Sequence, residues 1–269
     1  MHRDGWGGAG WRTGDTTFGF RYLNADGSWQ QEIVPGGGAV LNYSLCPGLN
    51  GELFTAHAIY VAYGVYYASR YASGSGWSDT EIWNGSVGTS YGAGQHPGGG
   101  IVYYAKDGDF LFYRQSGANW VNHGSVLSDA GTMASASLST AQDGRACLAW
   151  DFSTGGASDI RGAYLDADGE VGNQVATTPL ESLDTEPSAP ISTCTDGGEG
   201  WVFFSQADAA AESIWRARYV PGTGWLAAEE IDGGNLTCSD PRASVQGTGG
   251  AALWFRSNAS TELVVRILK

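Results

Sequence analysis

The sequence contains few charged residues and lacks the segments that define several classes of protein. Only 16% of its 269 residues are charged, and only two of its cations are lysines. No run approaches 18 apolar residues, so we expect no membrane insertion. Glycine does not recur at every third position, which excludes collagen. An aromatic content of 12% is too high for a disordered chain.

The charge that is present is mostly negative. The chain has 14 lysines and arginines against 28 aspartates and glutamates, which gives a net charge of −14. Such a chain repels phosphate backbones, so we expect no nucleic-acid partner. The sequence opens without an apolar signal segment, which fits a cytoplasmic protein or a mature secreted domain. Sequons favour the secreted or extracellular location, and they lie at Asn42, Asn84, Asn235 and Asn258.

Catalytic and metal-binding motifs are also missing. There is no CxxC motif and no Cys/His cluster, so we expect no metal and no cofactor. The histidines lie in no recognisable Ser/His/Asp arrangement and no GxSxG occurs, so no catalytic residue is predicted. The paired carboxylates are Asp79 with Glu81 and Glu229 with Glu230, and the second pair would point to opposite faces of a strand. Buried free thiols are favoured over disulfides for Cys46, Cys147, Cys194 and Cys238.

Glycine and aromatic residues are abundant, and they follow a repeat. The chain has 42 glycines, 11 tryptophans, 13 tyrosines and 9 phenylalanines. Short apolar segments with a central aromatic residue recur every 44 to 54 residues. Their large flat side chains are expected to pack between neighbouring repeats. The aromatic positions are Trp11, Tyr60, Tyr104, Trp150, Phe204 and Trp254.

A second apolar segment follows each aromatic segment and usually carries an arginine. The fourth repeat has Ala163 at this position, while Arg161 and Arg216 share a position slightly upstream. A guanidinium in a sheet needs a partner, so each arginine makes either a structural contact between repeats or a ligand contact. The arginines of the main position are Arg21, Arg70, Arg114, Arg218 and Arg266.

A tight turn and then a tryptophan follow in four of the repeats. These side chains either pack over the turns or form flat platforms for sugar rings. Together with the arginines they would form repeated sites, and repeated sites raise avidity. The turn tryptophans are Trp29, Trp77, Trp120 and Trp225.

This repeat predicts an all-β fold. Four short antiparallel strands in each period of about 45 to 50 residues are typical of a β-propeller blade. We predict a single propeller domain over residues 1–269, with six four-stranded blades and five as the alternative. The chain would begin inside one blade and end inside another. No stretch keeps a 3.6-residue period, and residues 206–213, the nearest helical candidate, are predicted to be a loop.

Two of the repeats resemble a known family. The segments FGFRYLNADGSW (Phe18–Trp29) and IRGAYLDADG (Ile160–Gly169) resemble the repeats of the fungal fucose-specific lectins, which are six-bladed propellers. RARYVPGTGW (Arg216–Trp225) is similar to a class of bacterial propeller repeats. The lectin resemblance implies a sugar held between blades by an arginine, a glutamate and aromatic residues. Arg161 and Arg216 match that arginine. At the positions that correspond to the family's glutamate, this sequence instead has Gln31, Gly172 and Ala227.

These observations together favour a multivalent carbohydrate-binding protein, a lectin, whose partner is a carbohydrate or glycoconjugate. Its predicted ligand contacts are the seven arginines and four turn tryptophans named above. A protein-interaction scaffold and a glycan-active hydrolase or lyase are the alternatives, since propellers host many functions. An enzyme is the less favoured class. The oligomeric state stays open.

Overall fold

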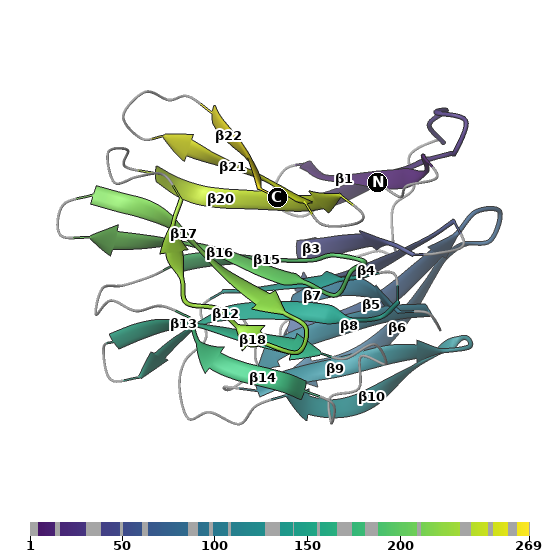
Figure 1. Ribbon diagram of the computed structural model, residues 1–269. Coiled ribbons are helices and arrows are strands. Elements are labelled where there is room, and N and C mark those ends of the chain that lie inside the picture. The colour runs from purple at the N-terminus through teal and green to yellow at the C-terminus, as the bar shows by residue number, and fades with distance from the viewer. Residues whose placement is uncertain are drawn as a thin grey trace. The chain divides into compact units, whose positions relative to one another are not determined.

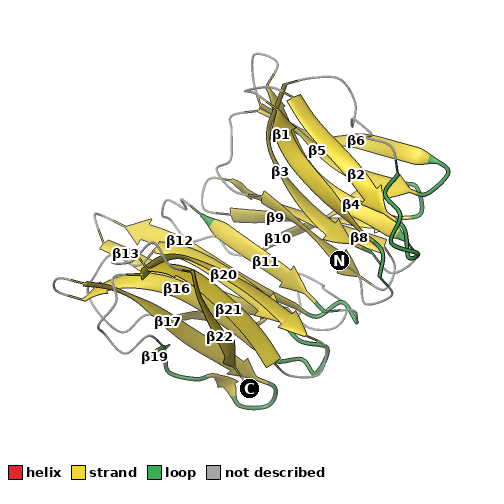
Figure 2. Ribbon diagram, turned by 90° about the horizontal axis from the view of Figure 1, so that it is seen from above, coloured by secondary structure: helices red, strands yellow, loops and turns green. Residues whose placement is uncertain are grey.

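The computed structural model describes most of the chain, and every described element of secondary structure is a strand (Figures 1 and 2). The described strands form six antiparallel sheets, as the six-fold repeat predicts. The described residues are 5–13, 17–30, 39–48, 51–60, 64–85, 91–96, 99–106, 109–126, 135–141, 143–154, 157–165, 174–180, 188–208, 211–231, 238–246, 250–257 and 263–268.

The chain divides into two units, which are described separately. The first unit comprises Met1–Lys106 with Phe110–Ser125, and the second comprises Asp107–Asp109 with Val126–Lys269. Each unit contains three of the six sheets. The single domain expected from the sequence stays a prediction.

The first unit holds a two-stranded sheet followed by two four-stranded sheets, in which neighbouring strands are consecutive in the sequence. The first sheet consists of β1 (Gly7–Thr13) and β2 (Thr17–Leu23). The second sheet consists of β3 (Ala39–Pro47), β4 (Glu52–Tyr60), β5 (Gly64–Ala72) and β6 (Gly76–Gly85). The third sheet consists of β7 (Tyr91–His96), β8 (Gly99–Lys106), β9 (Asp109–Ser116) and β10 (Asn119–Val126).

The second unit has the same consecutive order, except that β19 pairs with β17. The fourth sheet consists of β11 (Ala136–Thr140), β12 (Ala146–Thr154), β13 (Ala157–Leu165) and β14 (Gln174–Pro179). The fifth sheet consists of β15 (Ser188–Cys194), β16 (Gly200–Asp208), β17 (Ala211–Val220), β18 (Gly224–Trp225) and β19 (Glu229–Glu230). The sixth sheet consists of β20 (Cys238–Gln246), β21 (Gly250–Ser257) and β22 (Leu263–Leu268).

The strands fall where the repeat places them. In the four-stranded sheets the aromatic segment forms the second strand, and the arginine position lies on the third. Among the described residues, the first sheet begins with its aromatic strand and the sixth ends with its arginine strand, as expected for incomplete repeats. One prediction was wrong. Residues 206–213 are not simply a loop, because residues 206–208 are the end of β16 and residues 211–213 are the beginning of β17.

Serine hydroxyl groups join the first strands of neighbouring sheets within each unit. In the first unit the Ala93 amide donates to Ser44 Oγ at 3.1 Å. In the second unit the Ser192 amide donates to Ser137 Oγ and the Cys194 amide donates to Ser139 Oγ, both at 3.0 Å. These bonds satisfy backbone groups at strand edges, which would otherwise be open to pairing with another chain.

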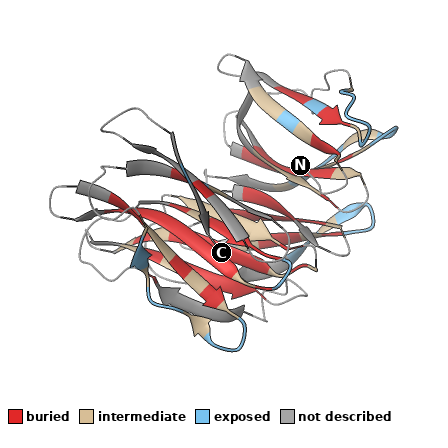
Figure 3. Cartoon of the chain, turned by 45° about the horizontal axis from the view of Figure 1, so that its top comes forward, coloured by how far each residue is buried: buried red, intermediate tan, exposed pale blue. Residues whose placement is uncertain are grey.

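The aromatic strands supply much of the core, as expected. Tyr104, Trp150 and Phe204 are each no more than 1% exposed. Buried positions run along the strands of the sheets (Figure 3). The side chains of Tyr60 and Trp254 lie outside the described residues. The structural role predicted for this position is therefore confirmed for these three residues, whereas Trp11 is only partly buried.

Glycines let the sheets of the first unit approach closely. A Cβ atom added at Gly100 would lie 2.6 Å from Phe54 Cγ and 2.7 Å from Trp120 Cη2. We expect Gly100→Ala to lower the free energy of unfolding by about 1–3 kcal/mol, because the ring atoms cannot yield without moving the core. Denaturant titration measures the loss. Gly197→Ala is the control, since its nearest atom would lie 3.6 Å away, and an equal loss in both variants would contradict the packing argument.

Candidate functional site

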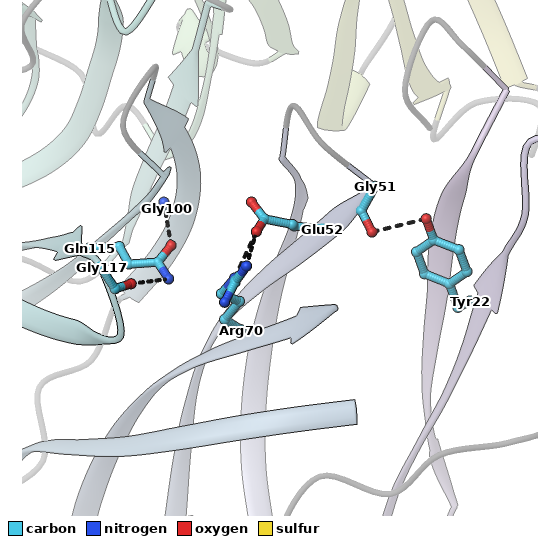
Figure 4. A network of polar contacts seen from close by, with 7 residues as sticks. All are labelled: Tyr22, Gly51, Glu52, Arg70, Gly100, Gln115 and Gly117. Atoms are coloured by element: carbon cyan, nitrogen blue, oxygen red, sulfur yellow. Dashed lines mark hydrogen bonds and ion pairs between the residues drawn. The ribbon is translucent and has the colours of Figure 1, made fainter. Parts of the chain in front are cut away.

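Two arginines of the main position pair with a glutamate beside the aromatic strand of their own sheet. Arg70 Nε donates to Glu52 Oε1 at 2.8 Å, and Arg218 Nη2 donates to Glu199 Oε1 at 2.6 Å (Figure 4 shows the first pair). Glu52 is the first residue of the aromatic strand β4, and Glu199 directly precedes the aromatic strand β16. The structural contact expected between repeats is thus made inside one sheet at these two positions.

The other arginines of the repeat have different surroundings. Arg21 is exposed, and its guanidinium lies 5.9 Å from the centroid of the Trp11 ring. Arg161 lies 4.1 Å from the centroid of the Phe152 ring and 3.7 Å from Asp159 Oδ2. Arg114 is half-buried on β9, and the Arg266 side chain lies outside the described residues.

Three of the four turn tryptophans pack against another sheet of the same unit. Trp77 meets Phe20 edge-on with ring centroids 5.1 Å apart, and Trp120 meets Phe54 in the same way at 6.1 Å. Trp225 packs on the core shared by the fourth and fifth sheets. Trp29 differs, because half of its surface is exposed. Of the two roles left open by the sequence, packing therefore fits three positions, and only Trp29 presents a large free face.

The fifth sheet brings an arginine and a glutamate together at the surface. Arg216 lies on β17 and Glu229 on β19, and the two residues are directly opposite each other in the ladder. Arg216 Nε donates to Glu229 Oε1 at 2.5 Å. The Arg216 side chain is 24% exposed and that of Glu229 is 60% exposed. The pair is partly open to solvent, so its remaining donors and acceptors can reach a ligand.

A buried tryptophan lies beneath this pair. The guanidinium carbons of Arg216 and Arg218 lie 5.2 and 4.8 Å from the centroid of the Trp201 ring. Arg216 and Arg218 are two residues apart on β17 and therefore share a face. The ring holds both guanidinium groups by cation–π attraction, while Glu199 and Glu229 accept from them. We call these five residues the Arg216 cluster: Glu199, Trp201, Arg216, Arg218 and Glu229.

From the sequence, Glu229 was named only as the neighbour of Glu230 and not as a partner of Arg216, because that pairing depends on a one-residue irregularity of the ladder. Tyr219 is opposite Trp225 and Arg216 is opposite Glu229, so three steps on β17 match four steps on the partner strand. A regular ladder continuing from Tyr219 and Trp225 would place Ala228 opposite Arg216, whereas the sequence match to the lectin repeats pointed to Ala227. The signal that the sequence offers is the Glu229–Glu230 dipeptide shortly after Trp225.

The cysteines whose side chains are described form no reactive thiol site, and the described acidic groups form no metal site. Cys46, Cys147 and Cys194 are free, as predicted for buried thiols, although Cys46 is only partly buried. Burial raises the pKa of the Cys194 thiol to about 12, so it is not a nucleophile at neutral pH. Within the described ranges, no three His, Cys, Asp or Glu side chains are placed to hold a metal ion. Those ranges also contain no helix long and apolar enough to cross a membrane.

Several solved structures resemble the chain while sharing little sequence with it. An ulvan lyase of polysaccharide lyase family 25, bound to a GlcA–Rha3S fragment, gives a TM-score of 0.61 at 11% identity, over 99% of this chain and 81% of that one. The Aleuria aurantia lectin in complex with Fucα1-6GlcNAc gives a TM-score of 0.55 at 15% identity, over 97% of this chain and 87% of that one. The α-L-arabinanase of Penicillium chrysogenum gives a TM-score of 0.55 at 11% identity, over 84% of this chain and 77% of that one. No family model and no curated protein matches the chain.

These likenesses show the fold. The chain is an all-β protein of the β-propeller class, and each antiparallel sheet corresponds to one blade. The structures that it resembles include a fungal fucose-binding lectin, as the repeat segments suggested. At these identities the likeness extends to the fold alone.

Proposed function

We propose that the protein is a carbohydrate-binding protein, and that the Arg216 cluster is its principal sugar site. The observation that supports this most strongly is the surface pair of Arg216 and Glu229 held above the Trp201 ring. It provides the arginine and glutamate that the lectin resemblance implies, at a position found from the strand ladder.

The chemistry of the cluster suits neutral hydroxyl groups. A guanidinium offers several fixed donors, and a carboxylate offers acceptors, so adjacent sugar hydroxyls can bond to both. Glu230 follows Glu229 directly and is exposed, and the whole chain carries a net charge of −14. We therefore propose a neutral saccharide, since an acidic one would meet repulsion.

Further sites of the same kind would make binding multivalent. Arg161 near Asp159 occupies the position in the fourth sheet that corresponds to Arg216 in the RGAY and RARY segments. The pair of Arg70 and Glu52 is a second candidate, with side chains 35% and 14% exposed. The measured number of sugar molecules bound per chain would give the number of sites that bind sugar.

A glycan array tests the proposed function. Labelled protein is expected to bind neutral glycans and to give weaker signals with sialylated, sulfated or uronate-containing glycans. Glu229→Gln removes the charged acceptor while keeping the shape of the side chain, and should lower every positive signal. No binding to any glycan would overturn the proposal. Pull-down partners that remain bound in excess sugar would favour the scaffold function instead.

A further inference from the structure

The fifth sheet presents an exposed apolar residue beside the Arg216 cluster. Leu226 directly follows the turn tryptophan Trp225, and its side chain is 42% exposed. The Leu226 amide donates to the Arg218 carbonyl oxygen at 2.8 Å, so the two residues are neighbours across the hairpin. Trp225 packs with Tyr219 on the core shared with the fourth sheet, and successive residues of an extended chain point to opposite faces. Leu226 therefore lies on the face that carries Arg216 and Arg218.

The second sheet has a polar residue at the position of Leu226. The two sheets are aligned by a row of three residues on three strands, which is Leu53, Tyr71 and Trp77 in one and Gly200, Tyr219 and Trp225 in the other. In this alignment Leu226 corresponds to Ser78, which is exposed and lies opposite Arg70. Arg216 corresponds to Ala68. The second sheet therefore has neither the exposed apolar residue nor the second arginine.

The third sheet has the apolar residue without the second arginine. Val121 follows the turn tryptophan Trp120 and is 44% exposed. The repeat places it beside Arg114, the arginine of the main position. Two residues before Arg114, where the fifth sheet has its second arginine, the third sheet has Phe112, which is 1% exposed. Among the described side chains of these three sheets, only those of the fifth combine an exposed apolar residue with two arginines and an exposed glutamate.

The accessible groups of this face lie in two neighbouring rows. Arg218 and Leu226 form one row, and Arg216 and Glu229 form the next. The rows are about 7 Å apart, because the two arginines are two residues apart on β17. Arg218 donates to Glu199 through Nη2, and its side chain is 34% exposed. A guanidinium has five N–H donors, so that of Arg218 can also donate to a ligand. The first row thus offers a donor beside an apolar side chain, and the second offers a donor beside an acceptor.

The row of Arg218 and Leu226 matches the chemistry of an acetamido group. Such a group carries a methyl group and a carbonyl oxygen on the same carbon atom. The methyl group gains free energy when it leaves water for the leucine side chain, and the carbonyl oxygen accepts a charge-assisted hydrogen bond from the guanidinium. A hydroxyl group lacks the methyl group, and the methyl group of a deoxy sugar lacks the acceptor. An acetamido group therefore fits this row better than either.

We propose that the Arg216 cluster selects saccharides that carry an acetamido group, and that Leu226 is the residue that determines this specificity. The acetamido methyl group packs on Leu226, and its carbonyl oxygen accepts from Arg218. Hydroxyl groups of the same sugar ring bond to Arg216 and Glu229 in the next row. This inference rests on the proposed function, because it names the class of sugar that the same site takes. Acetamido sugars are uncharged, in agreement with the neutral saccharide proposed above.

Titration calorimetry with matched pairs of sugars tests the inference. The pairs are N-acetylglucosamine with glucose, N-acetylgalactosamine with galactose, and N-acetylmannosamine with mannose. We expect the acetamido member of at least one pair to bind at least ten times more tightly than its hexose, because it adds a bond to a charged donor. Hexoses that bind as tightly as their acetamido counterparts, or more tightly, would overturn the inference and leave the proposed function standing. If none of the six sugars binds, the inference also fails, and the glycan array decides whether the proposed function fails with it.

Leu226→Ser tests the role of this residue and copies Ser78 of the second sheet. The exposed side chain contributes little to the core, so we expect an unchanged Tm. Loss of the methyl contact should lower the preference for the acetamido sugar over its hexose about three- to tenfold. Leu226→Ile keeps an apolar contact and should retain the preference.

Val121→Ser is the matched control for this variant. It makes the same kind of change at the same position of the third sheet, where Phe112 stands in place of the second arginine. We expect it to leave the preference unchanged. A preference that Leu226→Ser does not alter, or an equal loss in the Val121 variant, would overturn the role of Leu226.

Discussion

Replacing Arg216 by alanine is expected to weaken saccharide binding about 10- to 100-fold. Hydrogen bonds that involve a charged group contribute about 1.5–3 kcal/mol each, which corresponds to this range of dissociation constants. The guanidinium is 24% exposed and bonded to Glu229, which is itself 60% exposed. Loss of the arginine therefore leaves a carboxylate that water can solvate, so Tm should change little.

Titration calorimetry with a glycan that binds the wild-type protein measures this loss. Arg242→Ala is the matched control, because Arg242 is an exposed arginine on β20 of the same unit and lies outside the Arg216 cluster. Equal affinities of the wild-type protein and the Arg216 variant would remove this residue from the site. A similar loss in both variants would point to a general effect of net charge.

His57 should make the protein less stable as the pH falls from about 6.5 to about 4. Its pKa is lowered from 6.5 to about 4, first by burial, while the charge of Asp79 acts in the opposite direction. Between these values the unfolded chain binds a proton that the folded chain does not, so the free energy of unfolding falls with falling pH. A difference of this size corresponds to a loss on the order of 3 kcal/mol.

Denaturant titrations at several pH values between 4 and 7 measure this slope. His57→Phe should flatten it, since phenylalanine does not titrate and occupies the matching position in the fifth sheet. Other acidic groups contribute equally to both proteins, so the difference between the two curves isolates His57. Parallel curves would show that His57 is not buried in its neutral form.

The repeat was predictable because hairpins impose a regular spacing on the chain. Trp150 and Phe204 were placed on buried aromatic strands from sequence alone, and the structure buries both. The arginine position was also found, but its partner was not. Glu52 begins one aromatic strand and Glu199 directly precedes another, and both meet their arginines only when the hairpin closes.

The sites themselves depend on cross-strand register, which the sequence does not specify. Glu229 reaches Arg216 because one extra residue interrupts the last strand of the fifth sheet. Leu226 meets Arg218 only across the hairpin, and the two residues form no motif along the chain. Trp77 shows the same limit, since its packing on Phe20 involves a different sheet. Local spacing predicts strands, whereas pairing irregularities and contacts between sheets determine which side chains meet.

A crystal structure of the protein soaked in a mixture of neutral monosaccharides tests the central claim most directly. We expect sugar density at the Arg216 cluster, with hydroxyl groups bonded to Arg216 and Glu229 near the Trp201 ring. Density elsewhere with this cluster empty, or no density in crystals that admit the sugars, would contradict the claim.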